Sequence, residues 1–304
     1  MGGTPLRNWQ NINLMMKLGP VAVFSIVSYK SPRSREHPPG VAIWKDYNTG
    51  DILKARSIWR KIKDRLWWLQ PYAYPEADPF YADSLVQELD QLLAKFQPQI
   101  VVFAELWLYR YLRTVQKHQC RIIYDAHNIE TLLLRERYRS VEGVKSKIES
   151  RLLLTKVEAI ERDFVRQVDQ IWVCSQDDVC QLKKLYNPQV RPTHLINNGV
   201  NIAYYESVRL GECNLPTELE LIPWTLVFTA TFTYPPNLVA AEILINQIYP
   251  RLQQIYSQCR LILVGRNPPK SMKEVAQRDP GILVTGIVPD IRHYLSAASV
   301  VIVP

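Results

Sequence analysis

Short apolar runs alternate with amphipathic segments along the first two thirds of the chain. The runs are rich in β-branched and aromatic residues, and they lie at residues 21–27, 41–44, 99–103, 121–124, 170–174 and 193–196. Between them, segments such as residues 81–96 repeat apolar residues at the spacing of one helix face. Strands that alternate with helices in this way predict parallel strands joined by helical crossovers. We therefore expect a doubly wound α/β sheet.

The same alternation starts again after a loop-like segment at residues 203–223. The new apolar runs lie at residues 225–230, 260–264, 282–284 and 300–303. With 304 residues, of which 47% are apolar, the chain can fill two ordinary cores. We expect an N-terminal domain over residues 1–205 and a C-terminal domain over residues 206–304. The second domain is expected to be incomplete, because no helical pattern follows its last apolar run.

Polar side chains follow directly after the apolar run at residues 121–124. They are Asp125, His127, Asn128 and Glu130. Ligands of parallel sheets bind beyond the carboxyl ends of the strands, so His127 lies where chemistry is expected. Two later runs end in the same manner, one in Ser175 and the other in Asn198 and Gly199, which are expected to form a tight loop. The alternatives are that His127 satisfies a local turn and that Ser175 caps a helix.

A glycine pair, Gly2 and Gly3, leads into a helical pattern at residues 6–18. Such a pair normally follows a strand and lets backbone amides approach a ligand at the helix N-terminus. No strand precedes it here, so we expect the chain to begin just after its first strand. A second long helical pattern, at residues 131–168, is charged and has one expected break at residues 140–143.

Residues 54–69, K-A-R-S-I-W-R-K-I-K-D-R-L-W-W-L, combine apolar and basic residues on one predicted helix. Ile58, Trp59, Ile62, Leu66 and Leu69 share a face, and arginines and lysines occupy the remainder. Two interpretations follow for the stretch from Lys54 to Leu69. The helix lies on an anionic lipid surface, or its apolar stripe packs on the sheet and the basic residues are solvated.

The formal charge of +8, from 37 Lys and Arg against 29 Asp and Glu, favours anionic partners. The basic residues are dispersed and no nucleic-acid motif is present, so nucleic acid is the least favoured partner.

The five cysteines form no Cys-x-x-Cys pair, which predicts neither a disulfide framework nor a zinc site. With no apolar run of membrane-spanning length and no signal peptide, we expect a cytoplasmic protein, peripheral at the inner face of the membrane if residues 54–69 bind lipid.

Several motifs, taken in order, resemble the glycosyltransferase family 4 type of GT-B enzyme. They are Y-D-A-H-N-I-E at 124–130, V-C-S-Q-D-D at 173–178, I-N-N-G-V-N at 196–201, F-T-A-T-F-T-Y-P-P-N at 228–237, L-V-G-R-N-P at 263–268 and V-T-G-I-V-P-D-I-R-H-Y-L at 284–295. The resemblance implies two Rossmann-like domains that face each other across a cleft. It also implies retaining transfer of a sugar from a nucleotide-sugar to a glycan or lipid-linked acceptor.

The resemblance also implies roles for individual residues. His127 is the implied catalytic residue, near the transferred sugar. The implied donor-binding residues are Gly2, Gly3, Arg266, Asn267, Val288, Pro289 and Asp290. The implied cleft-lining residues are Asp125, Asn128, Glu130, Ser175, Asn198, Gly199, Thr231, Tyr234 and Asn237. No cofactor or metal is expected, since the nucleotide-sugar is a substrate. The alternative for the loops at Gly265 and Gly286 is that these are only turn glycines.

The end of the chain departs from the family pattern. Relatives carry, beyond the position of Pro304, a glycine-rich turn with a phosphate-binding lysine and two glutamates that grip the donor. We therefore expect a chain truncated at both ends, whose activity as given is open. Two other functions stay open as well: a non-catalytic GT-B-like binding module, and a GT-B nucleotide-sugar epimerase, which needs additional acidic residues.

Overall fold

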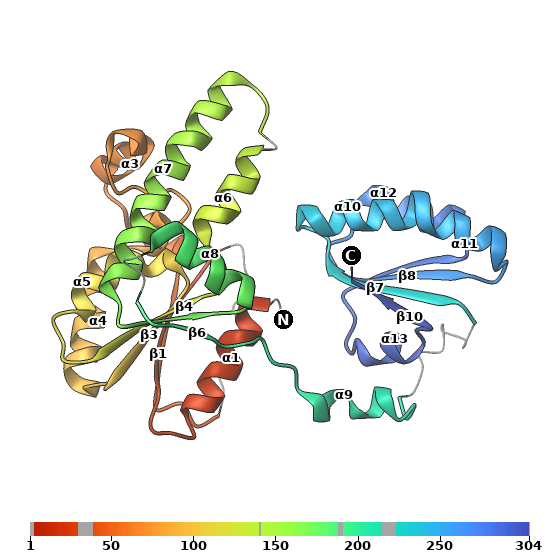
Figure 1. The fold of residues 1–304 in the computed structure, drawn as a ribbon, viewed down its shortest axis with the longest axis horizontal. Coiled ribbons are helices and arrows are strands. Elements are labelled where there is room, and N and C mark those ends of the chain that lie inside the picture. The colour runs from red at the N-terminus through yellow and green to blue at the C-terminus, as the bar shows by residue number, and fades with distance from the viewer. Residues whose placement is uncertain (1–2, 30–38, 140, 188–190, 214–222, 304) are drawn as a thin grey trace. The chain divides into compact units, whose positions relative to one another are not determined.

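The computed structural model describes residues 3–29, 39–139, 141–187, 191–213 and 223–303 (Figure 1). They form two compact units, unit 1 from Gly3 to Gly199 and unit 2 from Val200 onward. Unit 2 begins with helix α9 (Ile202–Arg209), which packs against α13 (Arg292–Ser296) of the same unit. The expected domain boundary after residue 205 lies inside α9. Residues 214–222 of the expected linker, and Gly2 of the glycine pair, lie outside the described residues.

Unit 1 is built from parallel strands and the helices between them. Its strands are β1 (Ala22–Val27), β2 (Ile43–Asn48), β3 (Ile100–Ala104), β4 (Arg121–Ala126), β5 (Gln170–Val173) and β6 (Thr193–Leu195). Its helices are α1 (Gly3–Met15), α2 (Thr49–Ala55), α3 (Ile58–Arg65), α4 (Asp83–Phe96), α5 (Leu112–Val115), α6 (Glu130–Arg139), α7 (Val144–Gln167) and α8 (Gln176–Tyr186), with 3-10 turns η1 (Trp67–Leu69), η2 (Asp78–Phe80) and η3 (Leu106–Tyr111).

The strands of unit 1 pair in two parallel sheets. Four strands follow the order β3-β4-β5-β6, and β1 pairs with β2 in a separate two-stranded sheet. In the larger sheet, β4 lies between β3 and β5, with Ile123 opposite Gln170. The five residues of β4 after Arg121 are all buried, as expected of a strand that is covered on both faces. The parallel α/β architecture predicted from the alternating pattern is therefore confirmed.

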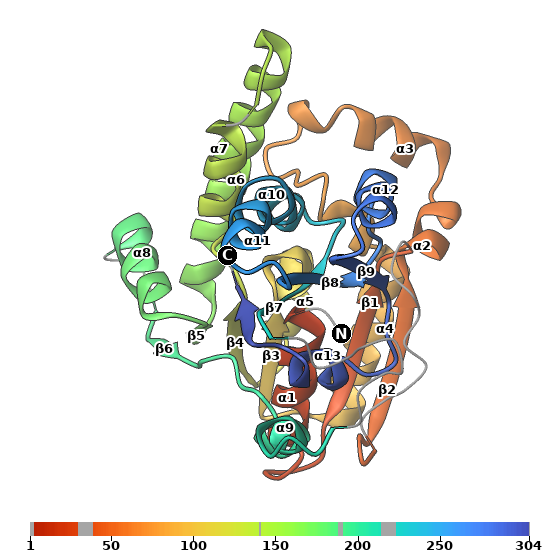
Figure 2. The same cartoon turned by 90° about the vertical axis from the view of Figure 1, so that its right-hand side faces the viewer.

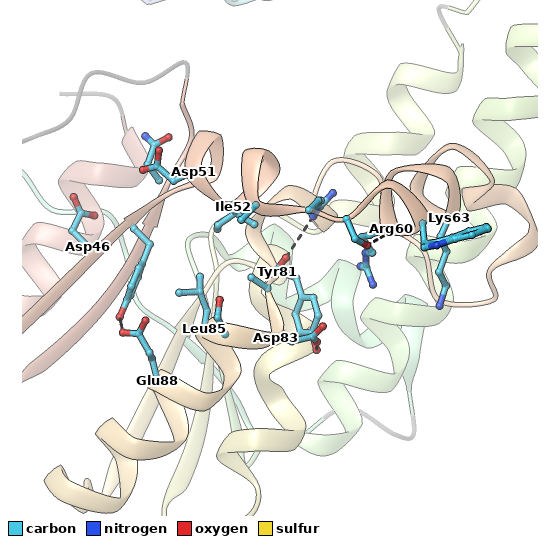
Figure 3. A pocket seen from close by; sticks show the side chains of 17 residues that line it. Asp46, Asp51, Ile52, Arg60, Lys63, Tyr81, Asp83, Leu85 and Glu88 are labelled. Carbon is cyan, nitrogen blue, oxygen red and sulfur yellow. Dashed lines mark hydrogen bonds between the residues drawn. The ribbon is translucent and has the colours of Figure 1, made fainter.

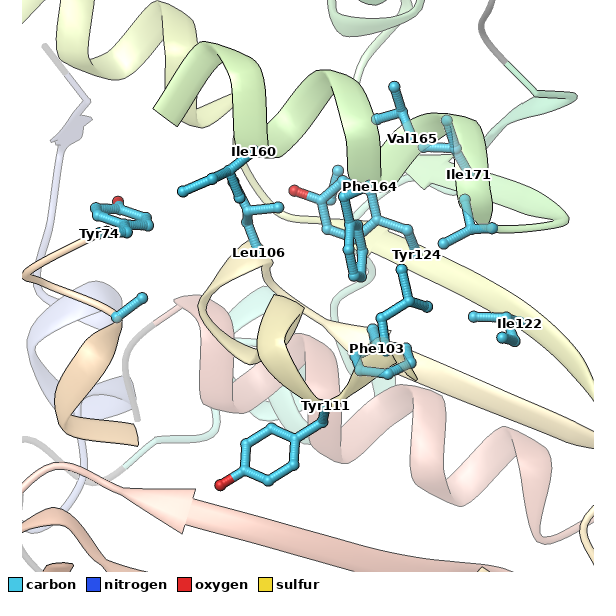
Figure 4. Close-up of a cluster of buried hydrophobic side chains, with 14 of the residues drawn as sticks. Tyr74, Phe103, Leu106, Tyr111, Ile122, Tyr124, Ile160, Phe164, Val165 and Ile171 are labelled. Carbon is cyan, nitrogen blue, oxygen red and sulfur yellow. The ribbon is translucent and has the colours of Figure 1, made fainter. Parts of the chain in front are cut away.

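An aromatic cluster joins the sheet of unit 1 to α7 (Figure 4). The ring of Phe164 on α7 meets Phe103 on β3 at 5.4 Å and Tyr124 on β4 at 5.0 Å, both edge to face. Ile160 and Val157 lie one and two turns earlier on the same buried face of α7. Edge-to-face pairs of buried rings stabilise such a junction beyond the area they remove from water. This packing fixes α7 over the strand that precedes His127.

α6 and α7 form an antiparallel pair that extends away from the sheet, as Figures 1 and 2 show. α6 ends at Arg139 and α7 begins at Val144, which is the break that was predicted within the long helical pattern. No helix in the described part of the chain is both long enough and apolar enough to span a bilayer.

The prediction of one helix over residues 54–69 is wrong. α2 ends at Ala55, Arg56 is extended, and Ser57 caps α3 by accepting a hydrogen bond from the Arg60 amide at 3.2 Å. The guanidinium of Arg56 binds the carboxylate of Asp64 and the carbonyl of Asp78, which holds the chain in this bend. The expectation that the apolar stripe packs on the sheet is also wrong, because no residue of α3 is buried.

Unit 2 has one four-stranded parallel sheet of order β10-β7-β8-β9. Its further elements are β7 (Thr225–Thr231), α10 (Pro235–Ile243), the π-helical turn η4 (Leu244–Ile248), α11 (Tyr249–Ile255), β8 (Arg260–Arg266), α12 (Lys270–Arg278), β9 (Ile282–Gly286) and β10 (Val300–Ile302). The strands β7 and β8 occupy the centre, and Leu261, Ile262 and Leu263 are fully buried. The second Rossmann-like alternation predicted from the sequence is thus present.

Candidate functional site

His127 follows the last residue of β4, and its side chain is only 5% exposed. Its Nε2 atom lies 3.3 Å from Oδ2 of Asp125, and its Nδ1 atom lies 3.7 Å from Oε1 of Glu105. Within the described chain, Nδ1 has no hydrogen-bond partner. The ring thus lies between two carboxylates. The ring is therefore fixed through one nitrogen, while the other keeps a free hydrogen-bonding capacity.

Asp125, the carboxylate that positions His127, is 1% exposed and held by α1. Nη2 of Arg7 lies 2.6 Å from its Oδ1, Nε of Arg7 donates to both oxygens, and Nδ2 of Asn11 donates to Oδ2 at 2.8 Å. Burial raises the pKa of Asp125, but the hydrogen bonds from His127 and Arg7 outweigh it and leave the pKa below its ordinary value. Asp125 is therefore an ionised anchor for the imidazole.

Arg7 also connects α1 to the loop after β6. Its Nη1 atom donates to the carbonyl of Ile196 at 2.7 Å and to Oδ1 of Asn198 at 3.0 Å. Gln10, one turn further along α1, donates to the carbonyl of Gly199 at 3.0 Å. Neither Asn198 nor Gly199 has a positive φ, so the loop is held by side chains of α1 and not by a left-handed turn. Of the two predicted cleft residues, Asn198 thus lies beside Arg7 and Gly199 beside Gln10, neither of which the sequence singled out.

Glu105 is a second residue that the sequence did not single out. It follows β3 with φ 80° and ψ 152°, a backbone conformation that costs about 1–3 kcal/mol in a residue with a side chain. Its amide donates to the carbonyl of Asp125 at 3.2 Å, which fixes this conformation next to β4. The pattern that singled out His127, a polar residue after a predicted strand, also applies to Glu105. Glu105 is the first charged residue after the apolar run at 99–103.

Glu130 lies in the interior of unit 1 and is 7% exposed. Its Oε2 atom accepts a hydrogen bond from the Tyr74 hydroxyl at 2.9 Å. The amides of Glu130 and Thr131 donate to the two carboxylate oxygens of Glu161, so Glu161 on α7 caps the start of α6. Burial, together with the nearby charge of Glu161, raises the pKa of Glu130 to about 7. Among the expected cleft-lining residues, Asp125 and Glu130 are therefore the two that the structure encloses.

Ser175 and Asn128 complete the polar positions at the strand ends of unit 1. The Ser175 hydroxyl accepts from the amide of Asp178 at 3.1 Å, so it is the N-cap of α8, as one of its two interpretations predicted. Asn128 is exposed directly after His127.

The strand ends of unit 2 gather most of the residues that were expected to bind the donor. β7 and β8 are parallel, with Thr231 opposite Arg266, so both residues lie at the carboxyl edge of the sheet. Arg266 and Asn267 are exposed, and the Arg266 guanidinium has no partner among the described residues. Asn237 donates to the Thr231 carbonyl at 3.0 Å, and Tyr234 between them is 54% exposed.

The carboxylate of Asp290, after β9, forms an ion pair with a neighbouring arginine. Nη2 of Arg292 lies 2.6 Å from its Oδ2, and the hydrogen bonds from the Arg292 side chain lower the pKa of Asp290 to about 2. The Arg292 guanidinium also lies 4.1 Å from the ring centre of Tyr204, which ties α9 to this loop. Val288 packs into a small apolar cluster with Tyr294, whereas Pro289 is exposed. The loop at 288–290 is therefore held from within unit 2.

Gly265 and Gly286 differ in what they require of the backbone. Gly265 has φ +148°, and a Cβ atom there would lie 1.7 Å from the carbonyl oxygen of Ala230. Gly286 has φ +74°, and a Cβ atom would meet nothing within 4 Å. Gly265 is thus a close-approach glycine between β7 and β8, and Gly286 is a turn glycine.

A cavity of about 790 Å³ lies in unit 1 between α2, α3, the end of β2 and the start of α4 (Figure 3). Acidic and basic side chains both line it: Asp46, Asp51, Asp83, Glu88, Arg56, Arg60 and Lys63. Tyr81 adds an aromatic ring and Tyr47 donates to Glu88. None of the residues predicted for the site lines this cavity.

No group of three or more His, Cys, Asp or Glu residues that could hold a metal ion is found within the described ranges.

The family model of glycosyl transferases group 1 matches residues 223–304. Among curated proteins, none matches the chain in sequence.

The fold resembles several solved structures at low identity. HepE from Anabaena, in complex with UDP and glucose, is 12% identical with a TM-score of 0.58, over 99% of this chain and 70% of that chain. Sucrose-phosphate synthase from Thermosynechococcus elongatus is 16% identical with a TM-score of 0.58, over 96% and 69%. The E. coli structure described as trehalose-6-phosphate bound with UDP-2-fluoro glucose is 11% identical with a TM-score of 0.53, over 97% and 72%.

These similarities show that the chain has the two-domain, Rossmann-like GT-B fold. Against HepE in complex with UDP, the aligned part is 56% of that chain. The chain thus spans between 56% and 72% of the length of the proteins compared above.

Proposed function

We propose that the chain is a retaining glycosyltransferase of the family 4 type, which moves a sugar from a nucleotide-sugar to a glycan or lipid-linked acceptor. The observation that carries the proposal is the match of residues 223–304, most of unit 2, to glycosyl transferases group 1. The GT-B fold supports it, since HepE has this fold in a complex with UDP and glucose. Fold alone does not imply function, so the residues at the strand ends add necessary support to the family match.

Unit 2 would hold the donor at the carboxyl edge of its sheet. A nucleotide-sugar carries a diphosphate, and a guanidinium is a bidentate partner for phosphate oxygens. Arg266 is exposed at this edge and is unpaired within the described residues, and Asn267 beside it supplies an amide. In unit 1, the role proposed for Gly3 at the N-terminus of α1 is to bind an anionic group through backbone amides.

His127 would act on the transferred sugar. Its Nε2 atom is engaged by Asp125, so Nδ1 is the atom that can bind a sugar hydroxyl. The carboxylates of Asp125 and Glu105 lie on either side of the ring and hold it in place. A hydrogen bond that strengthens as the glycosidic bond breaks would lower the barrier to transfer.

The test is donor binding and turnover by the full chain. Calorimetry with a panel of UDP-, GDP- and ADP-sugars should find one nucleotide that binds, and NMR of the product should show retained configuration. Arg266→Ala should weaken the binding of that nucleotide about 10- to 100-fold, because a charge-assisted hydrogen bond contributes about 1.5–3 kcal/mol. Arg278→Ala, on the exposed end of α12, removes an equal charge and should leave binding unchanged. Absence of binding across the panel would refute the proposal.

A nucleotide-sugar epimerase is the second candidate, and one observation favours it. An epimerase requires additional acidic residues at the strand ends, and Glu105 and Asp125 place two carboxylates around His127. An epimerase converts the donor sugar in the absence of any acceptor, whereas a transferase releases the nucleotide only as a glycoside forms. A non-catalytic module would bind the nucleotide and give neither product.

A further inference from the structure

α3 packs on unit 1 through its polar side, whereas a helix on an ordinary globular core packs through its apolar side. Its polar side faces the protein: Asp64 binds Arg56 at 2.6 Å and Arg60 at 3.2 Å, and all three side chains are at most 24% exposed. Arg60 also lies over the Tyr81 ring, 5.9 Å from its centre, beside the cavity of Figure 3. Ion pairs, not apolar contacts, therefore attach α3 to unit 1.

The apolar side of α3 and η1 points into solvent. The exposed fractions are 70% for Ile58, 78% for Trp59, 44% for Ile62, 38% for Leu66, 48% for Trp68 and 70% for Leu69. No residue of α3 or η1 is buried. Soluble proteins rarely leave a contiguous apolar patch of this size in water, and such patches mark interaction sites.

The charge around this patch has one sign. At 100° per residue, Lys61 and Arg65 lie along one side of the apolar face and Lys63 along the other, and all three are exposed. Asp64, the one acidic residue between positions 54 and 69, is turned inward and is already paired. The patch is thus an apolar strip bordered by cations, with tryptophans that favour the boundary between water and lipid.

A second exposed apolar patch, with more cations than anions around it, lies at the tip of the α6–α7 pair. Val144 is 77% exposed and Ile148, one turn later, is 63% exposed. Lys145, Lys147 and Arg151 lie around them and are also exposed, together with Glu142 and with Glu149, which pairs with Lys145 at 4.0 Å. Figures 1 and 2 both place this tip and α3 toward the same end of unit 1. Two apolar and cationic patches on one end of a compact unit fit an extended anionic surface better than a single small ligand.

We propose that α3 and η1 form an interfacial helix that lies on an anionic lipid bilayer, with the tip of α6–α7 as a second contact. Trp59 and Leu69 enter the headgroup region, and Lys61, Lys63 and Arg65 contact lipid phosphates. The cytoplasmic leaflet, which is the anionic one, is the surface that fits. This inference is independent of donor binding, because no residue of the donor edge takes part.

Vesicle co-sedimentation with the full chain tests it. Vesicles of phosphatidylglycerol and phosphatidylcholine should bind the protein, vesicles of phosphatidylcholine alone should bind much less, and binding should weaken as salt rises. The triple variant Lys61→Gln, Lys63→Gln, Arg65→Gln should bind roughly 100-fold less, at about 5-fold per cation. The double variant Trp59→Ala, Leu69→Ala should bind at least about tenfold less through lost apolar insertion.

Two control variants have matched chemistry and different positions. Lys183→Gln with Lys184→Gln removes exposed cations of α8, and Ile255→Ala removes an apolar side chain that is 71% exposed on α11. Both should bind vesicles as the unmodified chain does. Equal loss in controls and α3 variants, equal binding to both vesicle types, or no binding at all would overturn the proposal. A partner other than lipid, such as an acidic protein or RNA, is indicated if the α3 variants lose that ligand yet keep vesicle binding, and this also overturns it.

Discussion

The guanidinium of Arg7 lies 2.6 Å from the carboxylate of Asp125, across 118 residues of sequence. Arg7 is 4% exposed and Asp125 is 1% exposed, so the pair is buried at the start of the first described helix and the end of the central strand. A buried pair of this kind is a weak source of net stability, but its disruption leaves a buried charge unpaired. It also sets the position of His127, which Asp125 holds at 3.3 Å.

Replacing Arg7 by methionine should therefore destabilise unit 1 by about 3–5 kcal/mol in urea unfolding at pH 7. The pKa of Asp125 is lowered in the folded chain, so the stabilisation by Arg7 is present above the ordinary value of 3.8. It should be lost as the pH falls through the folded-state pKa. The double variant Arg7→Met, Asp125→Asn should recover part of the loss. Lys145→Met, which breaks an exposed pair with Glu149, should change stability by less than about 0.5 kcal/mol.

Replacing His127 by alanine tests the proposed chemistry. We expect sugar transfer to slow about 100-fold or more, while nucleotide affinity stays within about threefold, because His127 belongs to unit 1 and the proposed donor edge to unit 2. The control is His118→Ala, which removes another histidine of unit 1 that contacts an aspartate, Asp90, at 2.9 Å. Initial rates and calorimetry on both variants make the comparison. An equal loss of transfer and binding in His127→Ala would assign the histidine a role in folding.

The local features of the sequence predicted the order of elements well. The apolar run at 121–124 became the buried strand β4, and the break near residue 140 separates α6 from α7. Local patterns did not predict contacts between segments that are distant in the sequence. Periodicity identified the apolar face of α3, but the direction of that face depends on Arg56 and its partner Asp64, which turn the polar side inward. Arg7 was missed for the same reason, because its partner lies in another part of the chain.

Glu130 illustrates the limit for a single residue. Its place after β4 suggested an accessible carboxylate, yet Glu161, 31 residues later, caps its amide, and Tyr74 covers its side chain. Sequence order shows that a polar residue follows a strand. It does not show whether a later helix closes over that residue.

The pKa of Glu130, raised to about 7, predicts a pH dependence of folding. The ordinary value is 4.5, so the stability is fully present below pH 4.5 and is lost as the pH rises through 7. A shift of this size corresponds to about 3 kcal/mol. Glu130→Gln keeps an acceptor for Tyr74 and carries no charge, so it should be more stable than the unmodified chain at pH 8 and equal to it near pH 4. Glu136→Gln on the exposed side of α6 should follow the unmodified chain, and identical pH curves for all three proteins would contradict the prediction.

The contact between Gly265 and Ala230 predicts the most sensitive backbone position of unit 2. An alanine Cβ at position 265 would lie 1.7 Å from the Ala230 carbonyl oxygen, so β7 and β8 would have to separate at their carboxyl ends. The φ of +148° adds strain, and together these should cost at least about 3 kcal/mol.

Substitutions at Gly286 and Gly19 separate the two causes of that loss, the steric contact and the backbone strain. Gly286→Ala meets nothing within 4 Å but keeps a positive φ, so it should cost about 1–2 kcal/mol. Gly19→Ala has neither the contact nor a positive φ and should be neutral or slightly stabilising. Hydrogen exchange with mass spectrometry follows each unit separately. Gly265→Ala should lower protection at Leu261–Leu263 in the centre of β8 and leave β4 protected. Unchanged protection in β8 would show that the two strands can shift without loss of packing, and the steric argument would then be wrong.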